Sequence, residues 1–529
     1  MSAAVRARSG LRVLAAPFVV APPKGARTRT RVHLTVSEAA AIERIGVFLG
    51  CRYRETLAGR LRLGRMSAKG QAAWRTERKQ ALTAATSSRW AGAITRTAID
   101  SYDLGMRALG AHVDSLTAAA NAIGARLAAP VGGEVRDLDR PRAKPVRGYQ
   151  TQAERFAKSR RRAQLEARLA DALVRRGQGR PRIVAGGGRL WRNRAHLDQV
   201  GMTRAQWERR WTDERMFLTA DGESGKKCGN ETIRVTGEGV LTIKVPGALA
   251  GEFGPRLTIT PAVSLSTHRG EEWAMRIASN HAIRYDLRRD SRGRWYLDAS
   301  WAYADVPAVP LTVLQAQRTL GVDLNDGHVD AAVIDEHGNV IGAPVRLGFT
   351  IEGTTARRDA QVRHVITRLV HLATQHGCAS ISIENLGFDD ARAAGRETMG
   401  RGRRGKRFRR TVAGIPTAKF RTRLVGMAAT AGIAVIAVDP AYTSRWGRQH
   451  WLPALQACDP SVDGHQAAAV VIGRRSLGHR ARRKPVGPLT RQRTREGQPT
   501  RPAARRPMGS RSRVTSKPRA HDAAGPPDP

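Results

Sequence analysis

The sequence of 529 residues has few cysteines, few acidic residues and no long apolar run. Its four cysteines, Cys51, Cys228, Cys378 and Cys458, lie far apart and form no CxxC pair, so no disulfide framework is expected and a reducing cytosol fits. No apolar run approaches the roughly 20 residues that a membrane-spanning helix needs. Arg-rich sequence follows the short apolar stretch 13–21 at once, which argues against an export signal. We therefore expect a cytoplasmic protein with no membrane partner.

Acidic residues are scarce relative to basic ones. The chain has 45 Asp and Glu against 91 Lys and Arg, which gives a formal net charge of +46. A surplus of this size predicts a polyanionic partner, either nucleic acid or an anionic membrane, and the lack of a membrane segment favours nucleic acid. The length allows two to four domains, and the apolar residues suffice for at least one sizeable core.

Two Arg-rich segments are candidate nucleic-acid-binding surfaces. One is a helix predicted to begin at Thr151, and the other follows a buried strand that ends at residue 384. An ordinary solvated face is the alternative for each segment. The candidate side chains are Arg160, Arg161 and Arg162 in the helix, and Arg401, Arg403, Arg404, Lys406 and Arg407 in the second segment.

The spacing of apolar residues divides the chain into regions. Residues 1–30 and 479–529 are basic and poor in apolar residues, which predicts disordered tails. Residues 51–214 read mainly as helices. Residues 31–50 and 215–312 include short alternating runs, among them RWYLDASW and WAMRIA, which predict strands of a small β-barrel or sandwich. Residues 316–478 alternate buried strands with helices, which predicts an α/β domain. The expected fold class is multidomain: α/β plus a β-barrel, with a helical insertion.

Three carboxylates are candidate catalytic groups. Asp323 lies within the apolar strand 320–324, Glu384 ends the strand 381–383, and Asp463 directly precedes a helix. A charge in a buried strand is costly unless it is paired or binds a metal. Carboxylates that converge at one edge of a sheet are tolerated when they hold divalent cations, and two magnesium ions are the usual clamp for phosphodiester cleavage. Manganese is the alternative ion.

Each of these carboxylates also has a purely structural interpretation. Asp463 fits the N-cap of a helix, a position that aspartate favours. Asp323 could cap a turn with Asn325, and Glu384 could pair with an arginine. Their joint occurrence in a strongly basic chain favours the metal site.

Four motifs occur in order: GVDLN (321–325), SIENL (382–386), VDPAYTSR (438–445) and VDGHQAAAVVIGRR (462–475). They resemble the three RuvC motifs of the TnpB family, transposon-encoded RNA-guided nucleases related to type V CRISPR effectors. The stretches LTAATSSRWAGAITR (82–96) and IVAGGGRLWRNR (183–194) are also similar to that family. The resemblance implies an RNase H-like (RuvC) nuclease domain at 316–478. It also implies a helical recognition lobe at 51–214, inserted in a β-barrel wedge domain at 31–50 and 215–312.

The resemblance further implies an RNA-guided DNA endonuclease of transposon origin. Its partners would be a guide RNA and a target DNA, and base pairing would supply the sequence specificity. By the family's pattern, Asp323, Glu384 and Asp463 are the catalytic carboxylates and the ligands of magnesium or manganese.

The chain departs from the family pattern at one place. The family has a zinc ribbon with two CxxC pairs, whereas the interval 445–462 contains only Cys458. A closed zinc site needs four ligands, so no zinc is expected. Trp451, Leu452 and Leu455 have the spacing of a short helical turn and could hold this segment as a hydrophobic lid over the active site.

Three other functions fit parts of the sequence. A guided DNA-binding repressor with an inactive nuclease fits the missing ribbon. An actin-like ATPase also begins with a GVDLN-like phosphate loop, but the positive charge and the absence of a second Gly-rich adenosine motif argue against it. A transposase that joins strands directly would need a Tyr-based motif that this sequence does not contain.

Overall fold

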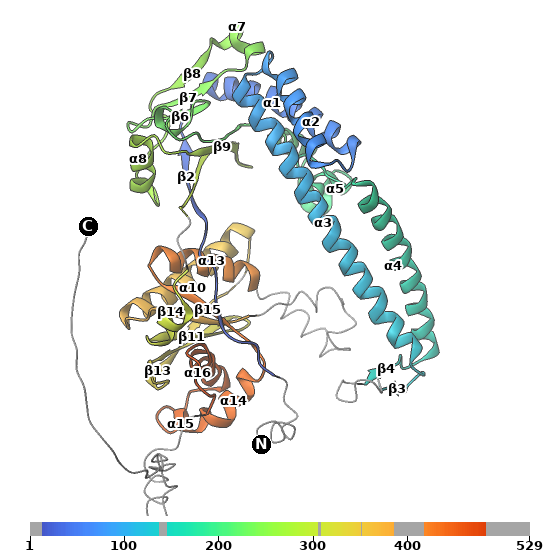
Figure 1. Cartoon of the computed structure of the whole chain (residues 1–529), viewed down its shortest axis with the longest axis vertical. Coiled ribbons are helices and arrows are strands. Elements are labelled where there is room, and N and C mark those ends of the chain that lie inside the picture. The colour runs from blue at the N-terminus through green and yellow to red at the C-terminus, as the bar shows by residue number, and fades with distance from the viewer. Residues whose placement is uncertain (1–12, 137–144, 305–307, 351, 386–416, 483–529) are drawn as a thin grey trace, which may run out of the picture.

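The computed structural model describes residues 13–136, 145–304, 308–350, 352–385 and 417–482. In Figure 1 a long helical arm and two small sheets lie in the upper part, and a larger sheet with helices on its faces lies below them. The N-terminal segment belongs to both parts, because β1 pairs with a strand of the lower sheet and β2 pairs with a strand of the upper one.

The helical region begins its long helices with side-chain caps. Thr35, Ser87 and Thr151 each accept a hydrogen bond from a backbone amide of the first turn. The first helix is continuous across the boundary expected at residue 50. None of the described helices is both long and apolar enough to cross a membrane. The helices of this region are α1 (Val36–Leu63), α2 (Ala68–Thr83), α3 (Ser88–Ala128), α4 (Gln152–Gln178), α5 (Gly188–Asn193) and α6 (Arg204–Asp213).

The arm in Figure 1 is made of α3 and α4, which pack side by side. Their contact is an apolar strip at helical spacing, with Leu109, Val113 and Leu116 from α3 facing Leu165 and other apolar residues of α4. The short strands β3 (Glu134–Val135) and β4 (Val146–Arg147) pair near its far end. The arm therefore keeps one face apolar and leaves the other faces of α4 exposed.

The β-rich region forms two open sheets among the described residues, so of the two expected forms, barrel and sandwich, the barrel is wrong. The strand orders are β2-β10-β9-β5 and β6-β7-β8. The two sheets do not hydrogen-bond into one ring, and instead share a single apolar core with α1 and the start of α3. The strands are β2 (Gly25–Val32), β5 (Thr219–Ala220), β6 (Ile233–Val235), β7 (Leu241–Lys244), β8 (Arg256–Ile259), β9 (Arg284–Arg289) and β10 (Trp295–Ala302).

The run WAMRIA, expected as a strand, is part of helix α8 (Gly270–Ala278). Trp273 and Ile277 are four residues apart and both are buried in the core, whereas Met275 is 63% exposed. A strand would have placed all three side chains on one face. The burial pattern therefore has the helical period, which a run this short does not reveal.

The N-terminal segment is ordered from β1 (Phe18–Val19) onward, so the expected disordered tail over residues 1–30 is wrong there. In β2 the side chains alternate: Thr28 and Thr30 are buried, while Arg27 and Arg29 pair with the buried carboxylate of Asp298 on β10. The alternation of buried and exposed side chains in β2 is typical of a strand. Because the exposed positions are arginines, the sequence resembled a disordered basic tail. Residues 1–12, and the second expected tail beyond residue 482, lie outside the described residues.

The larger sheet has six strands in the order β1-β15-β14-β11-β12-β13. Neighbours β11, β14 and β15 run parallel, whereas β12 and β13 are antiparallel additions beside β11. The strands are β11 (Thr319–Leu324), β12 (His328–Ile334), β13 (Val340–Gly348), β14 (Ser380–Glu384) and β15 (Ala434–Val438). Its helices are α10 (Thr355–Gln375), α13 (Thr417–Thr430), α14 (Thr443–His450), α15 (Leu452–Gln456) and α16 (Gly464–Ser476). The α/β architecture predicted for residues 316–478 is present.

The two faces of this sheet have different helices. Leu320 and Val322 point into a core formed with α10 and α13, and Gly321 between them lies against α16. β11 approaches α16 closely at Gly321, because a Cβ there would lie 2.2 Å from the carbonyl oxygen of Ala469 on α16. The glycine of the GVDLN motif thus lets α16 lie directly on β11, and this contact brings the start of α16 next to Asp323.

The segment that corresponds to the zinc ribbon of the resembled family folds into α14 and α15. Trp451 between them is 3% exposed, and its indole N–H donates to the carbonyl oxygen of Ala481 at 2.6 Å. It packs against α16 residues such as Ala467 and Val471. The expected apolar anchor at Trp451 is confirmed, while the lid over the active site stays a prediction.

Candidate active site

Asp323 and Glu384 come together at the ends of two neighbouring parallel strands. β11 and β14 pair with Val322 opposite Ile383, so residues 323 and 384 come next in register. Both side chains alternate with Val322 and Ile383, which belong to the core on the opposite face, and therefore face α16. The structure thus brings together two of the three predicted carboxylates.

Glu384 is held in a site that disfavours its charge. Burial, together with the negative charge of Asp323, raises the pKa of Glu384 to about 7. The Thr443 hydroxyl donates a hydrogen bond to Glu384 and partly opposes this rise, as does the positive charge of Arg475. Asp323 is itself only 5% exposed. Two buried carboxyl groups this close carry repulsion that a cation would relieve.

The VDPAYTSR motif supplies the support for this pair. Its Thr443 begins α14 and carries the hydroxyl that binds Glu384. Its Asp439 accepts hydrogen bonds from the backbone amides of Ala441 and Ala15, each at 2.9 Å, so it fixes both the motif and the N-terminal segment. The motif was recognised in the sequence, but these roles were not, because they depend on contacts between distant residues.

Asp463 is turned toward other partners. Its Oδ1 accepts the backbone amides of His465 at 2.9 Å and Gln466 at 3.3 Å, which makes it the N-cap of α16. Its Oδ2 accepts a hydrogen bond from Arg346 Nη2 at 2.7 Å. Burial opposes the charge, but Arg346 and the two amides hold the pKa of Asp463 below its usual range. The helix-cap interpretation is confirmed, and this carboxylate already has a cation beside it.

Asp330 and Arg346 were not among the predicted site residues. Asp330 lies opposite Asp323 on β12 and is fully buried. Arg346 on β13 donates to both of its oxygens, Nε to Oδ1 at 2.8 Å and Nη2 to Oδ2 at 3.2 Å. Burial raises the pKa of Asp330 and Arg346 opposes the rise. An aspartate inside the apolar strand HVDAAVI was a usable sequence signal, but its arginine partner was not.

His465 is a third residue that the sequence reasoning missed. Its Nδ1 lies 3.2 Å from Asp323 Oδ2, and Asn325 donates to the same oxygen at 3.0 Å. The hydrogen bond to Asp323 raises the pKa of His465 above its usual value. In its protonated form His465 would offset part of the charge on Asp323.

The donor set suits a hard divalent cation. Asp323 and Glu384 offer carboxylate oxygens, which magnesium prefers, in a place where their repulsion favours a cation. Within the described residues, no three Asp, Glu, His or Cys side chains are gathered closely enough to form a metal site as they stand. The fit to an ion thus rests on the oxygen ligands of the pair Asp323 and Glu384 alone. Asp463 would become a third ligand only by exchanging its bond to Arg346.

Replacing Arg346 by methionine is expected to lower the free energy of unfolding by about 1–3 kcal/mol, because it leaves a buried acceptor on Asp330 unsatisfied. Urea unfolding of the purified chain measures this change. The additional substitution Asp330→Asn should recover part of the loss. Arg204→Met is the matched control, because Arg204 pairs with Glu208 on the surface of α6, where such pairs contribute about 0.3–0.5 kcal/mol. Equal small losses for both variants would show that Asp330 does not depend on Arg346.

The predicted nucleic-acid-binding residues are placed only in part. Arg160, Arg161 and Arg162 lie on exposed positions of α4. Arg162 pairs with Glu166 at 2.7 Å, whereas no carboxylate in the described part of the chain pairs with Arg160 or Arg161. The second set, Arg401, Arg403, Arg404, Lys406 and Arg407, lies outside the described residues.

The chain has a weak structural likeness to a solved structure. No protein-family model matches the chain. No curated protein matches its sequence. Among solved structures, it is similar to RuvC from T. thermophilus in complex with a Holliday junction substrate. The match is 11% identical, covers 30% of this chain and 91% of that one, and has a TM-score of 0.22. A TM-score this low does not establish a shared fold.

Proposed function

We propose that this chain is an RNA-guided DNA endonuclease of transposon origin that hydrolyses phosphodiesters with magnesium or manganese. The observation that carries the proposal is the buried pair Asp323–Glu384 on adjacent parallel strands, in a chain with a formal net charge of +46. A strongly basic protein binds nucleic acid, and paired buried carboxylates suit the cations that cleave its backbone. The RNase H-like designation of the domain and the guide RNA rest on the sequence motifs.

The residues have separate tasks in this proposal. Asp323 and Glu384 hold the ion, and Asp463 joins them as the third catalytic carboxylate. When bound, magnesium supplies Lewis-acid stabilisation of the phosphate and an activated water. Thr443 orients the Glu384 carboxyl, and His465 orients Asp323. Because the pKa of Glu384 is about 7, its charged, ligand form becomes dominant only above neutral pH in the absence of an ion.

A nuclease-inactive, RNA-guided DNA-binding repressor is the second candidate. One observation favours it: Asp463 is bound to Arg346 at 2.7 Å, so the third carboxylate is already neutralised by a protein cation. In that case the basic surfaces would bind guide and target while the carboxylates remain structural.

Two measurements on the purified full chain separate these functions. Sequencing of co-purified RNA should give one discrete species, whereas random RNA would contradict the guided function. A labelled duplex complementary to that species should then be cut in magnesium and left intact after chelation. Binding without cutting in any divalent metal would favour the repressor. Cutting that persists in chelator would exclude the proposed site.

The arm should contribute to nucleic-acid affinity through its arginines, which would neutralise backbone phosphates. Replacing Arg160, Arg161 and Arg162 together by alanine is expected to weaken binding equally for all sequences. It should reduce the salt slope by about 0.9 for each phosphate that the variant no longer neutralises. Fluorescence anisotropy at several salt concentrations measures both effects. Arg357, Arg358 and Arg368 on α10, also exposed, form a control triple of equal charge. The same slope change in both triples would assign the effect to net charge and not to α4.

A further inference from the structure

Three tryptophans of α5 and α6 form a stack. Trp207 is buried, at 4% exposure, and its indole N–H donates to the carbonyl oxygen of Leu190 at 2.8 Å. Trp211 stacks on it with ring centres 5.5 Å apart and an angle of 14°. Trp191 follows, 5.5 Å from Trp211 at 37°, and is 42% exposed. The stack thus leads from the core of the helical region to its surface and ends in an exposed indole.

The glycines of the IVAGGGRLWRNR segment explain how this stack is built. Gly186 has a φ of +94°, and a Cβ there would lie 2.9 Å from the Trp211 ring and 2.8 Å from Arg215. A side chain at this position would therefore push against both. The chain then turns through Gly187 into α5, which carries Trp191. The motif thus fixes the position of Trp191, and no part of the proposed nuclease function uses it.

Cations surround the exposed indole. The Arg194 guanidinium lies over the Trp191 ring, 4.4 Å from its centre. A hollow of about 360 Å³ beside it is lined by Trp191, Arg192, Arg194, Ala195 and His196, with every lining side chain exposed. Among the described residues, no carboxylate pairs with Arg192 or Arg194. A flat guanidinium against an indole occupies the kind of place that a nucleobase takes on an aromatic side chain.

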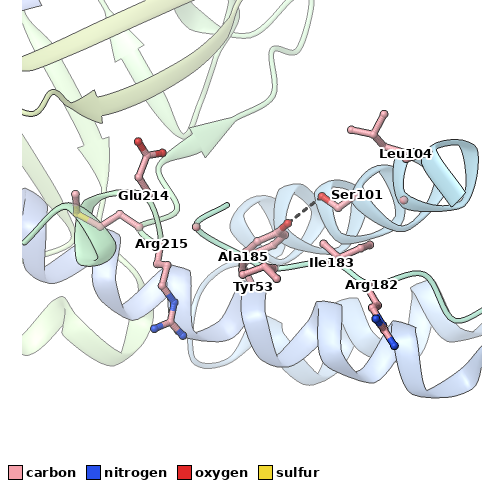
Figure 2. Close-up of a pocket in the computed structure, with 13 residues that line it drawn as sticks. Tyr53, Ser101, Leu104, Arg182, Ile183, Ala185, Glu214 and Arg215 are labelled. Carbon is pink, nitrogen blue, oxygen red and sulfur yellow. Dashed lines mark hydrogen bonds between the residues drawn. The ribbon is translucent and has the colours of Figure 1, made fainter. Parts of the chain in front are cut away.

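A second hollow is lined partly by the start of the same segment, at Ile183 and Gly186. It has about 420 Å³ and is drawn in Figure 2, with Tyr53, Ser101, Ile183 and Arg215 among its lining residues. The hydroxyl groups of Tyr53 and Ser101 hydrogen-bond to each other at 2.9 Å, shown by the dashed line. These hydroxyls already have each other as partners, and the Tyr53 ring stacks on Phe217. The Trp191 side is the better binding site.

We propose that Trp191 and Arg194 form a stacking site for an unpaired base of single-stranded RNA. An unpaired base offers the flat, neutral ring that fits on Trp191 or between it and Arg194, and its phosphates suit Arg192 and Arg194. A duplex keeps its bases stacked inside, whereas folded RNA exposes bases in loops and bulges, so the site suits an unpaired base of RNA and not a base pair. The inference deepens the RNA-guided part of the proposed function, on which it rests, but its test needs neither the carboxylates nor a metal ion.

The test compares binding to an RNA with binding to an oligomer that has the same backbone charge but no bases. Full-length protein is titrated, in chelator, into a labelled single-stranded RNA and into an oligomer of the same length and charge that lacks bases. Trp191→Leu, which keeps apolar cover on Trp211, is expected to raise the Kd for the RNA about 5- to 100-fold, the range for one stacked base. The Kd for the abasic oligomer should stay within about two-fold, since its phosphates meet the same cations. Trp191→Phe should retain most of the affinity.

The control is Phe156→Ala, because Phe156 is an aromatic residue of α4 that is 67% exposed. Equal losses for RNA and abasic oligomer in Trp191→Leu would overturn the proposal, as would a loss of the same size in Phe156→Ala. An unchanged Kd for the RNA in Trp191→Leu would also overturn it. Because the assay contains no divalent metal, a failed nuclease assay leaves this result standing.

Discussion

Replacing Asp323 by alanine is expected to lower DNA cleavage at least about 100-fold, since even outer partners of metal ligands are worth about 10- to 100-fold. Binding of guide and target should be nearly unchanged. The physical reason is that Asp323 is 5% exposed and faces Glu384, so it is placed to hold an ion and not to contact a phosphate from the surface. Cleavage and gel-shift assays on the same labelled duplex measure the two effects.

Asp326→Ala provides the matched control for this substitution. Asp326 lies three positions further along the chain and is exposed, so its loss changes the net charge equally without touching the Asp323–Glu384 pair. Cleavage should be unaffected in this control. Retained cutting in Asp323→Ala would exclude the carboxylate site. Parallel loss of cutting and of binding would mean that Asp323 supports the fold of the sheet and not the reaction.

The sequence predicted the position of the carboxylate pair because the information is local. Asp323 and Glu384 interrupt apolar strands, and parallel strands place their carboxyl ends at one edge of a sheet. The role of Asp463 as a helix N-cap was equally predictable, because an aspartate followed three residues later by Gln466 is a capping-box pattern. These features need only periodicity and the chemistry of a few neighbours.

The sequence could not predict the partners of these groups. Arg346 reaches Asp330 through the pairing of β12 with β13, and reaches Asp463 across 117 positions of sequence. Nothing local distinguishes Arg346 from the many other arginines of the chain. The same excess of arginine concealed the strand β2, whose buried threonines alternate with exposed cations. In a chain this basic, charge indicates the class of partner but obscures the individual ion pairs.

Glu384→Gln is expected to stabilise the metal-free protein at high pH and to abolish cleavage. The pKa of Glu384 rises from 4.5 to about 7 on folding, mainly because of burial and then because of Asp323. Between those values the native state binds more protons than the unfolded state, so stability falls as pH rises and levels off above about pH 7. The full penalty corresponds to up to about 3 kcal/mol. Glutamine removes it and can still accept the Thr443 hydrogen bond.

Melting temperatures in chelator at pH 5.5 and pH 8 test the direction of this pH dependence of stability. The gain of Glu384→Gln over the wild type should be larger at pH 8, where wild-type Glu384 is forced to ionise. Glu336→Gln is the control, because Glu336 is exposed and its neutralisation should change neither value appreciably.

Adding magnesium at pH 8 should raise the melting temperature of the wild type more than that of Glu384→Gln, since an ion that binds only the folded site stabilises it by mass action. The same pH dependence in Glu384→Gln and wild type would mean that Glu384 is not the group under strain. Equal shifts with magnesium would mean that the ion binds elsewhere.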